Sequence, residues 1–139
     1  MEKIYYSLEE ARKILPLISR KFSKILRLKA AVELLDSFSI ESEDYNMQYD
    51  LMALEMQKKY HKLMFKLFNE IQKLTSVGVI IKDLDAGLID FYSIFQDREI
   101  FLCWRYGEAT IYSWHEVENG FEDRKDVSSL ESKKFYRRK

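Results

Sequence analysis

Apolar side chains recur every three or four positions through most of residues 7–75, which is the period of an α-helix with one buried face. Ser7 and Glu10 have the spacing of a capping box at the start of the first helix. Pro16 is the only proline and lies inside the pattern, so it predicts a kink rather than an end. The first apolar series consists of Leu8, Ala11, Leu15, Ile18, Phe22 and Ile25.

A second helical series follows a turn that we expect near residues 37–42, with Ser42 or Asp44 as the cap of the next helix. Each helix should contain about thirty residues and extend roughly 45 Å. Residues 7–75 therefore predict a long antiparallel two-helix hairpin. The stripe of the second helix consists of Met47, Leu51, Leu54, Lys58, His61, Phe65, Phe68 and Ile71, and Met64, Leu67 and Leu74 widen it.

The pattern changes to the short β-branched and aromatic runs of strands in residues 77–116. Val79–Ile81, Leu88–Phe95 and Ile100–Tyr106 are predicted strands, and a two-residue turn at Gly107-Glu108 leads into a fourth strand that ends near His115. The predicted fold class is α+β, a helical hairpin followed by a small antiparallel sheet of about four strands. We expect one domain over residues 1–139, with a loop at 117–130 and a basic tail at 131–139.

Composition restricts the class of protein. The chain has 139 residues and one cysteine, which fits a single domain in a reducing compartment without a disulfide framework. No window approaches the ~20 consecutive apolar residues of a membrane span, and the charged first residues lack the apolar run of a signal peptide. We expect a cytoplasmic protein with no membrane association. A charged fraction of 33% would suit a heat-loving source.

The formal net charge is zero, but the charges are sorted into blocks. Residues 12–29 contain basic and no acidic side chains, residues 33–55 reverse this, residues 58–73 are mainly basic, and residues 82–123 are mainly acidic. Antiparallel pairing brings the two basic segments together, so we predict that the acidic sheet packs at the basic end of the hairpin. Binding of nucleic acid to this basic surface or to the basic tail is a weaker alternative, given the zero net charge.

Two helices of this length have more apolar surface than a single hairpin buries. Faces such as that of Met64, Leu67 and Phe68 are left over once one stripe of each helix is covered. A second copy of the chain would cover them in a four-helix arrangement with two-fold symmetry. We therefore expect a homodimer formed through the long helices.

Residues 103–124, CWRYGEATIYSWHEVENGFEDR, combine both tryptophans, the only cysteine and one of two histidines with arginines and acids. Buried polar groups need partners, so such a mixture is more typical of a site than of a plain core. We expect a polar and aromatic pocket where the sheet meets the hairpin. The candidate ligand-binding residues are Asp90, Trp104, Arg105, Glu108, Trp114 and Arg124.

The segments YSLEEARKILP, VGVIIKDLDAGLIDF, CWRYGE and WHEVENGFEDR occur in this order over nearly the whole chain. Together they resemble a prokaryotic family of domains of unknown function, numbered 2203. Tyr92 stands where that family often has a proline, and Asp123 where it tends to have a glycine, which affects the loop that presents Arg124. The family has no assigned biochemistry, so the resemblance implies only that the polar residues near the sheet are a recurring feature.

A metal site is one chemical interpretation, because Cys103, His115, Glu116, Asp83, Asp85 and Asp90 are all competent ligands. Their spacing matches no zinc motif. A two-residue turn at Gly107-Glu108 sets Cys103 opposite Tyr112, and Cys103 and His115 then point to opposite faces unless a bulge intervenes. We therefore predict no metal, and we interpret Cys103 as a buried, inert residue.

Acid–base chemistry is the second interpretation. His115 and Glu116 would act as catalytic residues, with Arg105 as the anchor for an anion, in a small hydrolase or lyase. The interpretation that we favour is a structural network of Arg–Glu and His–carboxylate contacts that holds the loop at 116–124 on the sheet. The leading hypothesis is thus a dimeric binding or assembly module, while enzymatic activity and the identity of any cofactor stay open.

Overall fold

The computed structural model describes residues 2–37 and 47–131 of the chain. The turn expected after Ser37, its candidate caps Ser42 and Asp44, and the basic tail beyond Glu131 lie outside these ranges. The contacts divide the chain into two compact units, which we call the sheet unit (Met1–Ser19 and Leu74–Lys139) and the hairpin unit (Arg20–Lys73). Each unit is described by itself below.

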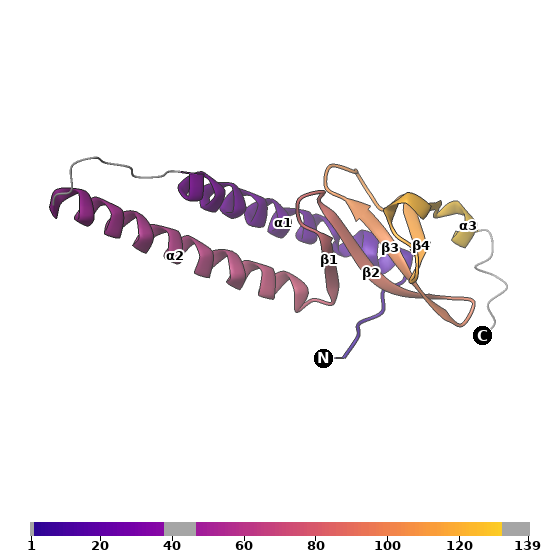
Figure 1. Cartoon of the computed structure of the whole chain (residues 1–139). Coiled ribbons are helices and arrows are strands. Elements are labelled where there is room, and N and C mark those ends of the chain that lie inside the picture. Colours follow the sequence, from indigo (N-terminus) through magenta and orange to yellow (C-terminus); the bar gives the residue numbers. More distant parts are fainter. Residues whose placement is uncertain (1, 38–46, 132–139) are drawn as a thin grey trace. The chain divides into compact units, whose positions relative to one another are not determined.

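Two long helices precede a five-stranded antiparallel sheet, which confirms the predicted α+β class with one more strand than expected (Figure 1). The strands follow one another in the sheet in chain order. No helix in the described part of the chain is long and apolar enough to cross a membrane. The elements are α1 (Leu8–Ser37), α2 (Met47–Thr75), β1 (Val79–Asp83), β2 (Leu88–Phe95), β3 (Arg98–Arg105), β4 (Ser113–Glu116), the 3-10 turn η1 (Phe121–Asp123), β5 (Lys125–Asp126) and α3 (Ser128–Glu131).

The capping box at the start of α1 is confirmed. The backbone N–H of Glu10 donates to Ser7 Oγ at 3.1 Å, and the Ser7 N–H donates to Glu10 Oε1 at 2.8 Å. Both backbone donors would otherwise lack a helical partner. The helix then continues through Pro16 to Ser37.

In the hairpin unit, the face of α2 that is buried differs from the predicted one. Leu51, Leu54, Phe65 and Phe68, which belong to the predicted stripe, are exposed. The covered positions form a second series with the same helical spacing, in which only Met64 and Leu67 belong to the predicted stripe as the residues that widen it; the series is made up of Ala53, Met56, Tyr60, Leu63, Met64 and Leu67. Both series are apolar and alternate by three and four residues, so periodicity alone could not decide which one faces α1.

The β2–β3 hairpin is confirmed, but β3 begins at Arg98 and ends at Arg105, whereas the strand was predicted over Ile100–Tyr106. Its turn consists of Gln96 and Asp97, which both have positive φ values, 52° and 62°. Two successive residues of this kind are typical of a two-residue turn whose twist matches that of the flanking strands. Phe95 and Arg98 therefore pair directly, and the register continues without a break to Leu88 and Arg105.

The pairing of β3 with β4 corrects the predicted register. Cys103 lies opposite Ser113, not Tyr112, and Phe101 lies opposite His115. Because side chains alternate along a strand, this shift of one position places Cys103 and His115 on the same face of the sheet. No two-residue turn connects these strands, since β4 begins only at Ser113.

The position of Ile111 explains why the connection from β3 to β4 is longer than the predicted two-residue turn. Its side chain is buried, and its carbonyl oxygen accepts hydrogen bonds from Arg12 Nε at 3.2 Å and from the Arg12 terminal nitrogen at 2.9 Å. The chain must therefore reach into the core at Ile111 before the next strand can begin.

The face of the sheet opposite to Cys103 and His115 forms most of the core of the sheet unit. It includes Phe91, Leu102 and Trp114. The Tyr6 ring packs edge-on against Phe91, with ring centroids 5.5 Å apart. The first turns of α1 lie against the sheet in Figure 1, and their apolar side chains Ala11, Leu15 and Ile18 are buried. This arrangement follows the apolar series from which α1 was predicted.

Two glycines with positive φ provide a test of packing at the entrance to the sheet. At Gly78 (φ 98°), an added Cβ would lie 2.7 Å from Ile4 Cβ, whereas at Gly107 (φ 104°) it would meet nothing within 4 Å. Gly107→Ala should lower the free energy of unfolding by about 1–2 kcal/mol through backbone strain alone. Gly78→Ala should lower it by roughly 2–4 kcal/mol, because overpacking adds to the strain. Urea denaturation measures both, and equal losses would contradict the predicted close packing at Ile4.

Candidate functional site

Three central strands each place one polar side chain on the same face of the sheet. Asp90 of β2 lies directly opposite Cys103 of β3, and His115 of β4 lies on the same face. Asp90 is 0% exposed, and Cys103 and His115 are each 1% exposed. One carboxylate oxygen, the sulfur and one ring nitrogen all lie within 4.8 Å of one another. We call these three residues the buried cluster.

The hydrogen bonds of His115 determine how its ring is used. Nδ1 lies 2.8 Å from the carbonyl oxygen of Glu116, which can only accept, so Nδ1 carries a hydrogen and donates it. Nε2 lies 3.3 Å from Asp90 Oδ1, within hydrogen-bonding distance of that carboxylate. Burial lowers the pKa of His115, but the hydrogen bonds to Asp90 and to the Glu116 carbonyl together outweigh it, so the pKa is raised.

The thiol of Cys103 lies in the same apolar and acidic surroundings. Burial, reinforced by the negative charge of Asp90, raises the pKa of Cys103 to about 12. The positive charge of Arg124 lowers the pKa of Cys103 by less than burial raises it, so the thiol stays protonated at neutral pH. This agrees with the interpretation of Cys103 as a buried and unreactive residue.

One atom of the buried cluster has no hydrogen-bond partner. Asp90 Oδ2 lies 3.2 Å from His115 Nε2, but only Oδ1 meets the geometry of a hydrogen bond, and Oδ2 is left without one. A buried acceptor in this state costs roughly 1–3 kcal/mol relative to one that is satisfied. It is therefore a feature that calls for a physical explanation.

A second polar network lies at the end of β3. The terminal nitrogen of Arg124 donates to both carboxylate oxygens of Glu108, at 2.9 and 2.8 Å. Glu108 Oε1 also accepts from the Arg105 backbone N–H at 2.7 Å, and its carbonyl oxygen accepts from Trp104 Nε1 at 2.9 Å. The Arg124 guanidinium lies 4.6 Å from the centre of the Phe121 ring. These contacts hold the loop before β5 against the end of β3.

The structure brings some of the predicted site residues together and separates others. The charges of Arg124 and Glu108 both act on the Cys103 thiol, so the Arg–Glu network adjoins the buried cluster. Arg105 joins the network through its backbone N–H, and its guanidinium lies 5.6 Å from the centre of the Phe121 ring. Sequence reasoning did not place Cys103 in the site, because the predicted register pointed it to the other face.

Trp104 and Trp114 have side chains on the opposite face from the buried cluster, because they alternate with Cys103 and His115 along their strands. Trp114 Nε1 donates to Ser129 Oγ at 2.9 Å. Their indole rings therefore contribute to the core rather than to the surroundings of the cluster.

The two proposed catalytic residues also point in different directions. The Glu116 carboxylate accepts from Arg98 at 2.9 and 2.7 Å, and Arg98, with a smaller effect from Lys125, lowers the pKa of Glu116 to about 2. His115 instead faces Asp90 on the buried side of the sheet. His115 is only 1% exposed, and a catalytic role for His115 and Glu116 stays a prediction.

A protein-family model matches residues 4–127, which include the buried cluster and the Arg–Glu network. The chain belongs to the uncharacterised conserved protein family DUF2203. This confirms the resemblance noted in the four sequence segments. No curated protein and no solved structure gives a significant match to this DUF2203 chain.

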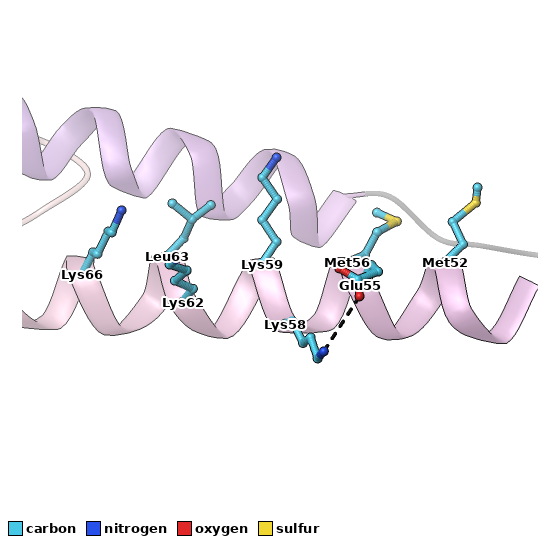
Figure 2. Close-up of a pocket in the computed structure, with 8 residues that line it drawn as sticks. All are labelled: Met52, Glu55, Met56, Lys58, Lys59, Lys62, Leu63 and Lys66. Atoms are coloured by element: carbon cyan, nitrogen blue, oxygen red, sulfur yellow. Dashed lines mark ion pairs between the residues drawn. The ribbon is translucent and has the colours of Figure 1, made fainter.

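The DUF2203 chain also has a groove along α2, with a volume of about 730 Å³. Its floor is apolar, and the lysines Lys58, Lys59, Lys62 and Lys66 border it. Figure 2 shows Lys59, Leu63 and Lys66 pointing to the same side of the helix, while Lys58 turns toward Glu55. The buried cluster does not line this groove, and the pocket expected where the sheet meets the hairpin stays a prediction.

A double-mutant cycle tests whether the Arg–Glu network of this DUF2203 protein is structural. For Glu108→Gln and Arg124→Gln we expect a coupling of about 1–2 kcal/mol in the free energy of unfolding, because the pair is partly buried and hydrogen-bonded. The surface pair Lys29–Glu33 of α1, which lies outside the Arg–Glu network, is the control and should give only ~0–0.5 kcal/mol. Equal couplings in the two cycles would show that the network does not hold the loop.

Proposed function

We propose that this DUF2203 protein is an assembly module in which α2 pairs with α2 of a second copy. The observation that supports this is a row of large apolar side chains in contact with solvent. Leu51, Leu54, Phe65 and Phe68 are 56%, 48%, 67% and 59% exposed. Each such side chain is worth about 1.5–3 kcal/mol when it is fully buried. Large apolar side chains that gather on one exposed face of a helix typically mark an interaction site.

The spacing of the row favours a helix as the partner. Its positions 51, 54, 58, 61, 65 and 68 are separated alternately by three and four residues, as in the seam of a coiled coil. The series that faces α1 occupies other positions, so the two apolar series lie on different faces of α2. One face is already used within the hairpin, and the second is left for pairing between chains.

Antiparallel pairing makes the row complementary to itself. When the two copies are related by a two-fold axis between positions 58 and 61, Leu51 faces the partner's Phe68 and Leu54 faces the partner's Phe65. Lys58 then faces the partner's His61 at the centre. All four apolar side chains meet apolar side chains in this register, and each contact occurs twice because of the symmetry.

Charge supports the same arrangement. Glu55 and Lys62 flank the row on one side, and in the antiparallel register each faces its opposite charge on the partner. A parallel arrangement would instead place Lys58 against the partner's Lys58, which is unfavourable. Two hairpins joined in this way form a four-helix arrangement, as proposed from the length of the helices.

The apolar row can be tested by introducing charge into it. The variant with both Phe65→Glu and Phe68→Glu should be monomeric at concentrations at which the wild-type chain is a dimer, as measured by sedimentation equilibrium. Val117→Glu is a matched control, because Val117 is an apolar residue of the sheet unit that is 40% exposed, and it should leave the dimer intact. A wild-type chain that is monomeric at ~100 µM would refute the proposal, because even a transient interface would produce dimers at that concentration.

Charge reversal tests the antiparallel register separately. Glu55→Lys alone and Lys62→Glu alone should each weaken dimerisation by about 2–10-fold, since each places like charges together. The variant with both changes should recover most of the loss. Circular dichroism checks that helix content is unchanged. A double variant that is weaker than either single variant would exclude this register while leaving the apolar row as the interface.

A further inference from the structure

We propose that Asp90, Cys103 and His115 are the ligands of one divalent metal ion of the zinc class. This proposal concerns the sheet unit and is independent of the pairing of α2. The donor set combines a thiol sulfur, an imidazole nitrogen and a carboxylate oxygen, and zinc accepts all three kinds of ligand. The residues come from three adjacent strands, which hold their side chains more firmly than a loop would.

The orientation of His115 is that of a metal ligand. Histidines that bind metals almost always donate their other ring N–H to a carboxylate or a backbone carbonyl, which fixes the ring and its tautomer. The Nδ1–H of His115 donates to the Glu116 carbonyl oxygen at 2.8 Å. Nε2 is thereby directed toward Asp90 and is available as the ligand atom.

The separation of the ligand atoms fits the size of such an ion. His115 Nε2 lies 3.3 and 3.2 Å from the two oxygens of Asp90. Two N or O ligands of a tetrahedral zinc ion are separated by about 3.3 Å, given metal–ligand distances near 2.0–2.1 Å. The sulfur is within 4.8 Å of the other ligand atoms, and a sulfur in such a site lies about 3.6 Å from them. A rotation of the Cys103 side chain or a small shift of β3 covers the difference.

The unpaired oxygen of Asp90 is the independent observation that points to a ligand. Oδ2 belongs to a side chain that is completely buried, has no hydrogen bond and faces His115. In a purely structural hydrogen-bond network in a core, every donor and acceptor normally has a partner, because an unpaired acceptor lowers stability. A bound cation gives this oxygen its missing partner.

The charges of the site also balance. A divalent ion with a thiolate, a carboxylate and a neutral imidazole has a net charge of zero, which a buried position requires. Binding displaces the proton of the Cys103 thiol, because the thiolate is the form that coordinates a metal. Three protein ligands leave one tetrahedral position for a water molecule or another small ligand.

Cobalt(II) titration of the tag-free full-length chain tests the site. We expect one cobalt per chain, intense visible bands of tetrahedral cobalt, and a near-ultraviolet thiolate-to-cobalt band, all of which added zinc removes. The chain has a single cysteine, so the thiolate band by itself identifies Cys103. A chain that binds no cobalt and no zinc, or that binds cobalt without the thiolate band, would overturn the proposal.

Variants separate the buried cluster from other ligands. Cys103→Ala should abolish the thiolate band and weaken cobalt binding by at least tenfold. His61→Gln changes the only other histidine, which is exposed on α2, and it should bind as the wild type does. Zinc should raise the melting temperature of the wild type and of His61→Gln but not that of Cys103→Ala. Equal stabilisation of all three, or loss of binding in His61→Gln, would refute the site.

Discussion

The register between β3 and β4 is the constraint on which the interior of the sheet unit depends. The buried side chain of Ile111 and the bonds from Arg12 to its carbonyl oxygen delay the start of β4 until Ser113. With this register, Cys103, Asp90 and His115 share a face, and a shift by one residue would turn His115 away from the other two. A single packing requirement in a connection thus determines which polar groups meet in the core.

Local signals were sufficient for the two long helices and the first three strands, but not for η1, β5 and α3, which lie where a loop was expected. The capping box at Ser7 and Glu10 and the bounds of β2 agree with the structure, because each depends on residues that are close in sequence. The register of β4 could not be predicted, since it depends on Arg12, which is far from Ile111 along the chain. The prediction for the buried face of α2 was right only for the residues that widen the stripe, such as Leu67, because two apolar series with the same spacing compete and only contacts with α1 distinguish them. The same error in register concealed the buried cluster, although all three of its residues had been considered as ligands.

The two units of the chain differ in which side chains are buried and which are exposed. In the sheet unit, polar side chains are buried at the centre, and charged pairs such as Arg124–Glu108 lie around them. In the hairpin unit, large apolar side chains such as Phe65 are exposed, and lysines border the groove beside them. Both are departures from the usual distribution, and both point to interactions that the isolated chain does not complete.

The two edges of the sheet have a consequence for how copies of the chain can meet. An open edge strand is a template for adding strands from another molecule, and proteins commonly block it with bulges, lysines or very short strands. The β1 edge has an irregular register between Ile81 and Asp83, with Lys82 at that point, and β5 is only two residues long. Lys125 of β5 also covers the Trp114 ring, at 4.7 Å from its centre. Such irregular and short edge strands disfavour the fibre-like addition of strands from other copies of the chain.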